Sequence, residues 1–307
     1  MQSRRPKKRG WGPVTLLIII LLFLLLIFPG RILFDLKDLF TGESGLADQV
    51  HYESQNIYVY NLTDGEVVFE KNSRERVAPA SLTKIMTVYA ALRRLDDLSE
   101  LAPVDTDAYL EMVAGNASMA GFYGNEQTSY RDLLYGTMLA SGGECAKSLA
   151  INLDGTEENF VDDMNAIADQ LGLTNTHFVN PEGFDAPGQY SSAEDIGRLL
   201  VTALDDGDFY VLFTTPSFLS RSTPDHPDGL LIESTVLSKL TEVDWTDYRI
   251  LGGKSGTTDR AGLCWATLAE KNEKQYIIVV MGAPFESDYS QGDGQILDTL
   301  QILENLD

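Results

Sequence analysis

The sequence predicts an α+β protein in which one antiparallel sheet is built from both ends of a domain and a helical subdomain is inserted between them. Three observations support this fold class. Runs rich in β-branched and aromatic residues occur near 55–70 and again over 249–282. Between them, from 81 to about 205, apolar residues recur at three-to-four spacing, as on helices. Hydrophobic residues make up 44% of the 307 residues, which is ordinary for a packed globular protein.

The amino-terminal segment is predicted to lie in a membrane. Residues 1–10 are rich in arginine and lysine, and residues 11–28 carry no charge. A bilayer-spanning helix needs about 17–25 residues, so this run is near the lower limit. It ends in Phe28-Pro29-Gly30 and not in the small residues of a cleavage site, which favours an uncleaved signal-anchor over a cleaved signal peptide. The positive-inside rule then predicts a cytoplasmic segment at 1–10 and a single-pass protein of the cell membrane, with its main domain on the extracytoplasmic side.

Residues 29–50 are expected to form a stem, and residues 51–307 the main domain. The domain should open with a hairpin, with strands at 55–61 and 66–70 around the turn Thr63-Asp64-Gly65. The expected helices are 82–95, 130–139, 144–151, 157–171 and 193–204. The expected later elements are strands at 249–253, 262–269 and 275–282 and a final helix at 295–306.

Composition excludes several classes of function. The net charge of −23 argues against nucleic acid as a partner. The three histidines lack the spacing of metal ligands, so the sequence gives little support for a metal site or for a Ser-His-Asp triad. No cofactor is implied. The two cysteines are too few for a disulfide scaffold. Cys264 lies in an apolar run and is expected to be buried, and a single bridge to Cys145 stays open.

Ser81 and Lys84 form the most informative pair in the chain. They lie three residues apart at an expected helix start, so their side chains share one face. A serine hydroxyl needs an adjacent base to become a nucleophile, and an unprotonated lysine in a dry pocket can supply one. The pair is a candidate nucleophile and base; the alternative is a helix cap next to a solvated lysine.

Two other segments carry side chains of similar chemistry. Ser141 lies in a glycine-rich turn between two expected helices. Lys254 and Ser255 lie on an expected edge strand flanked by glycine, and glycine there would permit close backbone approach by a ligand. Each segment alone is equally consistent with an ordinary turn or bulge.

Together, the three segments resemble the Ser-x-x-Lys, Ser-x-Asn and Lys-Thr-Gly motifs of penicillin-binding proteins and serine β-lactamases. The order and spacing are most similar to the low-molecular-mass, serine-type D-alanyl-D-alanine carboxypeptidases (peptidase S11-like). The similarity runs from roughly Asn56 to Pro284 and includes the stretch 178–185. This resemblance implies a β-lactamase/transpeptidase-like form of the α+β fold.

The resemblance also implies roles for individual residues. Ser81 would attack the carbonyl of the penultimate D-alanine, Lys84 would take its proton, and Ser141 would relay a proton to the departing D-alanine. The substrate-binding residues would be Lys254, Ser255, Gly256 and Thr257. Of these, Lys254 and Ser255 would bind the terminal carboxylate. The backbone N–H groups of Ser81 and Thr257 would form the oxyanion hole.

The implied partners are a peptidoglycan stem peptide ending in D-Ala-D-Ala and β-lactams as covalent inhibitors, with no metal. A positive charge on Lys254 is expected to disfavour charge on Lys84. Two departures from the motifs stand out. Gly143 replaces the usual asparagine, and Ser255 replaces threonine but keeps the hydroxyl. Glu144 is a candidate substitute for the missing amide, although we expect it to be a solvated acid at a helix N-terminus.

The expected function is removal of the terminal D-alanine from stem peptides through an acyl-enzyme. Gly143 motivates an alternative, a catalytically weak peptidoglycan-binding or penicillin-sensing protein. A β-lactamase is less favoured, because no Glu-x-x-Leu-Asn segment follows Ser141. Transpeptidation differs only in using an amine as the acceptor, and the sequence leaves it open.

Overall fold

The computed structural model describes residues 51–243, 245, 247–285 and 292–306. The predicted cytoplasmic segment, membrane anchor and stem lie outside these residues. The chain divides into two units, Met1–His51 and Tyr52–Asp307, and all elements described below belong to the second. Within the described residues, no helix is long and apolar enough to cross a membrane.

In the second unit, long strands precede and follow a helical segment as predicted, but short strands also occur within that segment. The helices are α3 (Thr83–Leu92), α4 (Thr106–Ala114), α5 (Tyr130–Met138), α6 (Gly143–Asp154), α7 (Glu157–Gln170), α8 (Ala193–Ala203), α9 (Gly207–Thr214) and α10 (Gly294–Asn305), with 3₁₀ turns η2 (Ala80–Leu82) and η3 (Leu237–Leu240). The strands are β1 (Asn56–Asn61), β2 (Glu66–Lys71), β3 (Leu101–Pro103), β4 (Gln127–Ser129), β5 (Ser217–Leu219), β6 (Leu231–Glu233), β7 (Tyr248–Thr258), β8 (Gly262–Lys271) and β9 (Lys274–Ala283).

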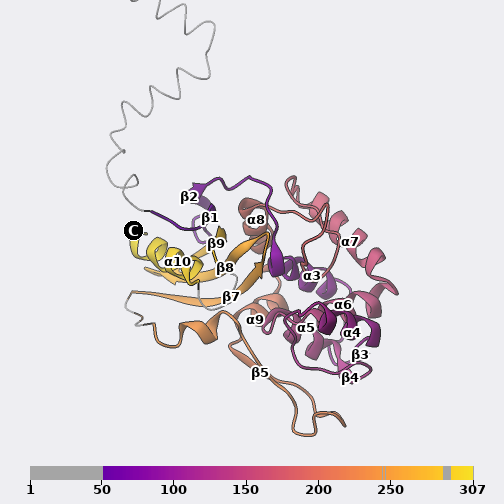
Figure 1. Cartoon of the computed structure of the whole chain (residues 1–307). Helices are drawn as coiled ribbons and strands as arrows, with labels where there is room; N and C mark the ends of the chain where they lie inside the picture. Colours follow the sequence, from indigo (N-terminus) through magenta and orange to yellow (C-terminus); the bar gives the residue numbers. More distant parts are fainter. Residues whose placement is uncertain (1–50, 244, 246, 286–291, 307) are drawn as a thin grey trace, which may run out of the picture. The chain divides into compact units, whose positions relative to one another are not determined.

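The main sheet joins the two ends of the unit, as the sequence predicts. Its five strands run in the order β2-β1-β9-β8-β7, and every neighbouring pair is antiparallel. Strand β1 pairs with β9 although more than 200 residues separate them. The predicted edge strand is confirmed, because β7 ends the sheet. In Figure 1, α10 lies on one side of this sheet, and α3 and α8 lie on the other.

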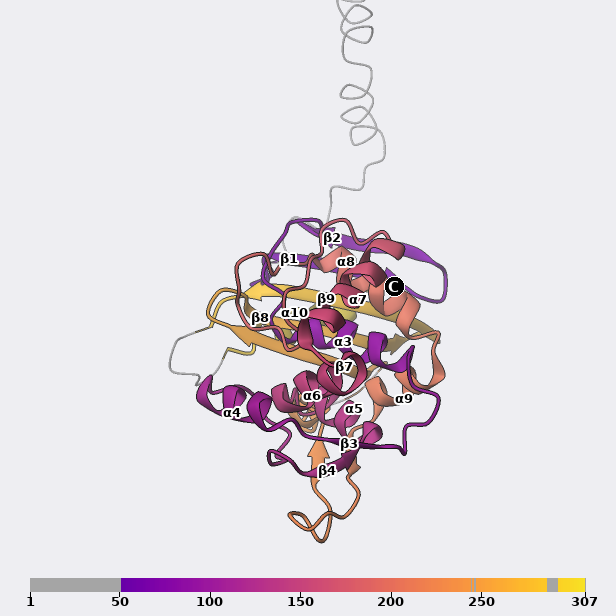
Figure 2. The ribbon, with the colours of Figure 1, turned by 90° about the vertical axis from the view of Figure 1, so that its right-hand side faces the viewer.

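Strand alternation explains why both faces of the sheet are covered. Ile57 and Val59 point to the face that packs against α10, whereas Tyr58 between them points to the helical subdomain. Helix α8 lies close against that second face, because a Cβ at Gly197 would be only 2.4 Å from the ring of Tyr58. In Figure 2 the helices α3, α5, α6 and α7 lie in front of the sheet.

Several boundaries differ from the prediction. The first helix ends at Leu92 and not at 95, and the strand expected at 249–253 continues to Thr258. Helices α4 and α9 and the short strands β3 to β6 were not predicted. Cys264 is buried as predicted. Both cysteines are free, so the possible Cys145–Cys264 bridge is not formed.

Candidate active site

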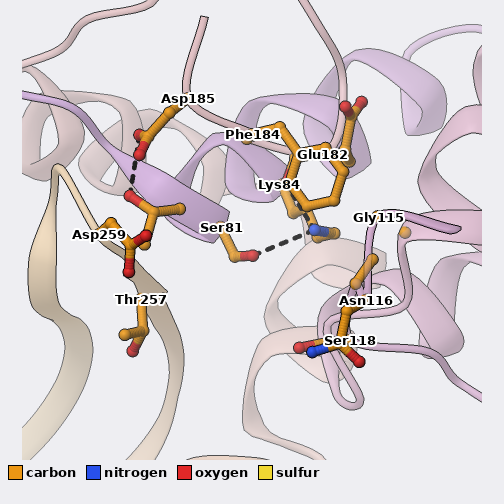
Figure 3. Close-up of a pocket in the computed structure, with 14 residues that line it drawn as sticks. Ser81, Lys84, Gly115, Asn116, Ser118, Glu182, Phe184, Asp185, Thr257 and Asp259 are labelled. Carbon is orange, nitrogen blue, oxygen red and sulfur yellow. Dashed lines mark hydrogen bonds between the residues drawn. The ribbon is translucent and has the colours of Figure 1, made fainter. Parts of the chain in front are cut away.

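Ser81 lies in a strained turn at the start of the first helix. Ala80 before it has φ of +47°, a left-handed conformation that is costly for a residue with a side chain. Ser81 belongs to η2, and Lys84 follows in the first turn of α3. The Lys84 Nζ lies 3.1 Å from the Ser81 Oγ (Figure 3), so the structure brings the predicted nucleophile and base into contact.

The environment of Lys84 makes its neutral form more accessible than that of a solvated lysine. Its side chain is buried, and burial lowers the pKa of Lys84 to about 8, against opposing contributions from Glu182 and Glu144. Burial and the nearby Lys84 charge together lower the pKa of Lys254 well below its usual value. Because repulsion between two ammonium groups is mutual, this effect on Lys254 and the predicted effect of Lys254 on Lys84 are one and the same interaction. Two buried amines that repel each other are not both fully charged near neutral pH.

Ser141 occupies the turn between α5 and α6, where its φ is +62°. It is buried, and the Lys254 Nζ donates a hydrogen bond to its Oγ over 2.8 Å. The same Nζ also donates to the Ser255 carbonyl oxygen. The predicted site residues therefore form two hydrogen-bonded pairs, Ser81 with Lys84 and Ser141 with Lys254, and the two pairs come from different parts of the fold.

Strand β7 lies directly against the nucleophile turn. A Cβ at Gly256 would be 2.9 Å from the backbone nitrogen of Ser81, so glycine is needed for this approach. The group that approaches Gly256 in the structure is the backbone of the nucleophile itself, and the predicted approach of a ligand to this segment stays a prediction. Ser255 is held from its other side, because its Oγ lies 2.8 Å from the Thr235 Oγ1. Sequence reasoning missed Thr235, which lies in no recognised motif.

The loop at 180–185 completes the surroundings of Lys84. The Lys84 Nζ donates to the carbonyl oxygen of Glu182 over 2.5 Å. Gly183 has φ of +92°, and a Cβ there would be 2.0 Å from the Ala80 carbonyl oxygen. The Asn180 Oδ1 accepts the Gly183 N–H and fixes the turn. The sequence similarity covered this loop without giving it a role, and the Asn-Pro-x-Gly pattern was the signal that could have indicated one.

A pocket of about 570 Å³ opens over the nucleophile. In Figure 3 it has Ser81 and Lys84 at its centre, Thr257 on one side, and Asn116 and Ser118 on the other. Of the predicted site residues, Ser81, Lys84 and Thr257 line this pocket, whereas Ser141, Lys254, Ser255 and Gly256 are not among its lining residues. Asp185 supports the wall next to β7, where it accepts a hydrogen bond from the Thr258 hydroxyl.

Two features define the region of Gly143, and the second contradicts the prediction made for Glu144. A Cβ at Gly143 would be 2.6 Å from the Met112 Sδ, so a methionine occupies the space of the absent side chain. Glu144 is fully buried. The prediction that it is a solvated acid is therefore wrong. The Glu144 Oε1 accepts hydrogen bonds from the backbone nitrogens of Ala120 and Gly121. Glu144 therefore anchors this loop through its Oε1.

A family model and curated relatives both match this chain. Residues 44–285 match the family model described as D-alanyl-D-alanine carboxypeptidase. The chain is 30% identical over 252 residues to D-alanyl-D-alanine carboxypeptidase DacF of Bacillus subtilis, covering 81% of this chain and 62% of DacF. It is 33% identical to DacC of Escherichia coli, covering 73% of this chain and 55% of DacC. The chain thus spans less than two thirds of the length of these curated relatives.

Solved structures share the same architecture. The crystal structure of the Streptomyces K15 DD-transpeptidase superposes with a TM-score of 0.70 at 24% sequence identity, covering 83% of this chain and 97% of that protein. At this level of identity the match establishes the fold. The predicted β-lactamase/transpeptidase-like α+β fold is therefore confirmed.

Proposed function

The chain belongs to the D-alanyl-D-alanine carboxypeptidase family, and on this basis we propose that it is a serine-type peptidase that removes the terminal D-alanine from peptidoglycan stem peptides. The observation that carries the proposal is the 3.1 Å contact between the Ser81 Oγ and the Lys84 Nζ beside an open pocket. Burial lowers the pKa of Lys84 to about 8, so a useful fraction of this amine is neutral near physiological pH.

Acylation begins when the Ser81 Oγ adds to the carbonyl carbon of the penultimate D-alanine while Lys84 accepts the hydroxyl proton. The backbone N–H groups of Ser81 and Thr257 stabilise the negative charge on the carbonyl oxygen. The peptide C–N bond then breaks, and the proton that Lys84 accepted is relayed through Ser141 to the departing nitrogen, which leaves as the amine of D-alanine. The carboxylate of that D-alanine is bound by Lys254 and Ser255.

Deacylation returns the enzyme to its starting state. A water molecule adds to the ester carbonyl, the ester C–O bond breaks, and the shortened peptide leaves as a carboxylate. One proton of the water passes through Lys84 to the Ser81 Oγ, and the other is released to solvent when the new carboxylic acid ionises. A β-lactam follows the same first step, because opening of its ring leaves an ester on Ser81, which makes it a covalent inhibitor when deacylation is slow. An amine acceptor in place of water would make the reaction a transpeptidation.

The proposed location is the outer face of the cell membrane. The uncharged run at 11–28 and the basic residues at 1–10 support a single-pass anchor with a cytoplasmic amino terminus. Extraction of membranes with alkaline carbonate tests this: the full chain should stay with the lipid, and deletion of 11–28 should release it.

The activity test uses the full chain in detergent. Mass spectrometry after incubation with benzylpenicillin should show one adduct on Ser81, and a pentapeptide ending in D-Ala-D-Ala should lose one D-alanine. Ser81→Ala should abolish both results. An adduct without D-alanine release would favour a peptidoglycan-binding or penicillin-sensing protein, which Gly143 motivates. Rapid hydrolysis of the β-lactam would favour a β-lactamase, and absence of an adduct would refute Ser81 as the nucleophile.

A further inference from the structure

The pocket offers one side-chain amide close to the position where Gly143 lacks one. Among the described residues that line the pocket, Asn116 is the only one with an amide side chain. Gly143 lines the same pocket. Figure 3 places Asn116 on the side of the nucleophile opposite Thr257, so a bound peptide would lie between the edge strand β7 and this residue.

Asn116 is part of a loop that is fixed to the start of α6. The Gly143 N–H donates to the Ser118 carbonyl oxygen over 2.8 Å. The buried Glu144 accepts hydrogen bonds from two more backbone nitrogens of the loop, at Ala120 and Gly121. Asn116 therefore has a defined position relative to Gly143, although the two residues are far apart in the sequence.

The end of α4 contacts Gly143 and also leads the chain to Asn116. Met112 fills the space that a side chain at Gly143 would need, as its Sδ lies 2.6 Å from the site of the absent Cβ. One turn later the chain reverses, with Asn116 in a left-handed conformation (φ +51°) that asparagine tolerates better than most residues. One helix end thus fills the space beside Gly143 and presents an amide to the same pocket.

The Asn116 side chain is exposed, and no hydrogen bond joins it to another residue of the described chain. An asparagine amide offers both an N–H donor and a carbonyl acceptor, which together match the carbonyl and N–H of a peptide bond. Resting on the proposed function, we propose that Asn116 binds the substrate amide on the acyl side of the scissile bond and so supplies a side-chain amide to the pocket that Gly143 also lines.

The test compares two β-lactams that differ at the group Asn116 should contact. Benzylpenicillin carries an acylamino side chain, and 6-aminopenicillanic acid lacks its carbonyl. We expect Asn116→Gly, which suits the positive φ, and Asn116→Asp, which removes the donor but keeps the shape, to slow acylation by benzylpenicillin about tenfold. Acylation by 6-aminopenicillanic acid should change by less than about twofold, since the lost contact is absent there.

Asn272→Gly is the matched control. Asn272 is also exposed and left-handed (φ +51°), but it lies in the turn between β8 and β9 and does not line the pocket. This variant should acylate at the wild-type rate with both compounds. The inference is overturned if the Asn116 variants acylate normally or if they lose the same factor with both β-lactams. If the wild-type chain forms no adduct and releases no D-alanine, the proposed function fails and this inference fails with it.

Discussion

The hydroxyl of Thr235 lies 2.8 Å from the hydroxyl of Ser255, which is proposed to bind the substrate carboxylate together with Lys254. Thr235 is itself fixed, because its N–H donates to the carbonyl oxygen of Leu139, just before the turn at Ser141. One residue thus connects the edge strand β7 to the turn that carries the proposed proton relay. A hydroxyl with a fixed partner loses less rotational freedom when it binds a ligand, so Thr235 is a positioning residue for Ser255.

Thr235→Val should therefore weaken substrate binding. Valine keeps the shape but removes the partner of Ser255, and loss of one neutral hydrogen bond corresponds to roughly a three- to tenfold effect. We expect KM for the pentapeptide to rise by this factor with a smaller change in kcat, as measured by D-alanine release. Thr235→Ser, which keeps the hydroxyl, should restore KM. A fall in kcat alone would contradict a role in carboxylate binding.

The pH dependence of acylation should report the protonation of Lys84. Only the neutral amine can accept the Ser81 proton, and burial lowers the pKa of Lys84 to about 8. The amine is therefore mostly protonated below this value and mostly neutral above it. We expect the rate of acylation by benzylpenicillin to rise with pH and to reach half of its maximum near the Lys84 pKa of about 8. Lys84→Met should abolish this pH dependence and lower the rate of acylation by a factor of about 10²–10⁴.

Glu182→Gln should move the midpoint of the pH profile of acylation to lower pH. The Glu182 carboxylate is the largest of the contributions that raise the pKa of Lys84. Removing its negative charge makes the ammonium form of Lys84 less favourable, so the pKa falls and acylation becomes faster near neutral pH. Glutamine keeps the size of this buried side chain and leaves the Glu182 carbonyl that contacts Lys84 in place. A pH profile of acylation measures the shift, and a midpoint that moved to higher pH would contradict this reasoning.

Gly183→Ala should damage both stability and acylation. The added Cβ would lie 2.0 Å from the Ala80 carbonyl oxygen, and the positive φ alone adds strain of about 1–3 kcal/mol. Relief of the clash must displace the nucleophile turn, so the rate of acylation should fall even at temperatures well below the melting temperature, where the variant is folded. Gly207→Ala is the control, because the helix start at Gly207 leaves open space around an added Cβ. That variant should be at least as stable as the wild type.

Long amphipathic helices and the sheet were predictable because their periodic patterns reflect real burial. Helix α4 was missed for the opposite reason: Leu110 and Val113 are more than half exposed, while only Ala108 and Met112 on this helix are buried. Strands of three residues, such as β5 and β6, are too short for alternation to be detected.

The pairing of Ser81 with Lys84 is local and could be anticipated from the spacing of the two residues. The partners of Glu144 could not, because they lie about 24 residues away in a loop. The same holds for Thr235, which meets Ser255 only because of the register between distant segments. Contacts set by tertiary packing leave no periodic signal, so the parts of the site that position the reacting groups had to come from the structure.

Gly143 and Met112 should behave as a coupled pair in stability measurements. Gly143→Asn alone should be destabilising, since its Cβ would meet the Met112 Sδ at 2.6 Å. Met112→Ala alone should cost about 2–5 kcal/mol, because Met112 is fully buried. In the double variant the asparagine can enter the space that the methionine leaves, so the loss in unfolding free energy should be smaller than the sum of the two single losses. Urea denaturation of the four proteins measures this coupling; strictly additive losses would show that Met112 is not what excludes a side chain at Gly143.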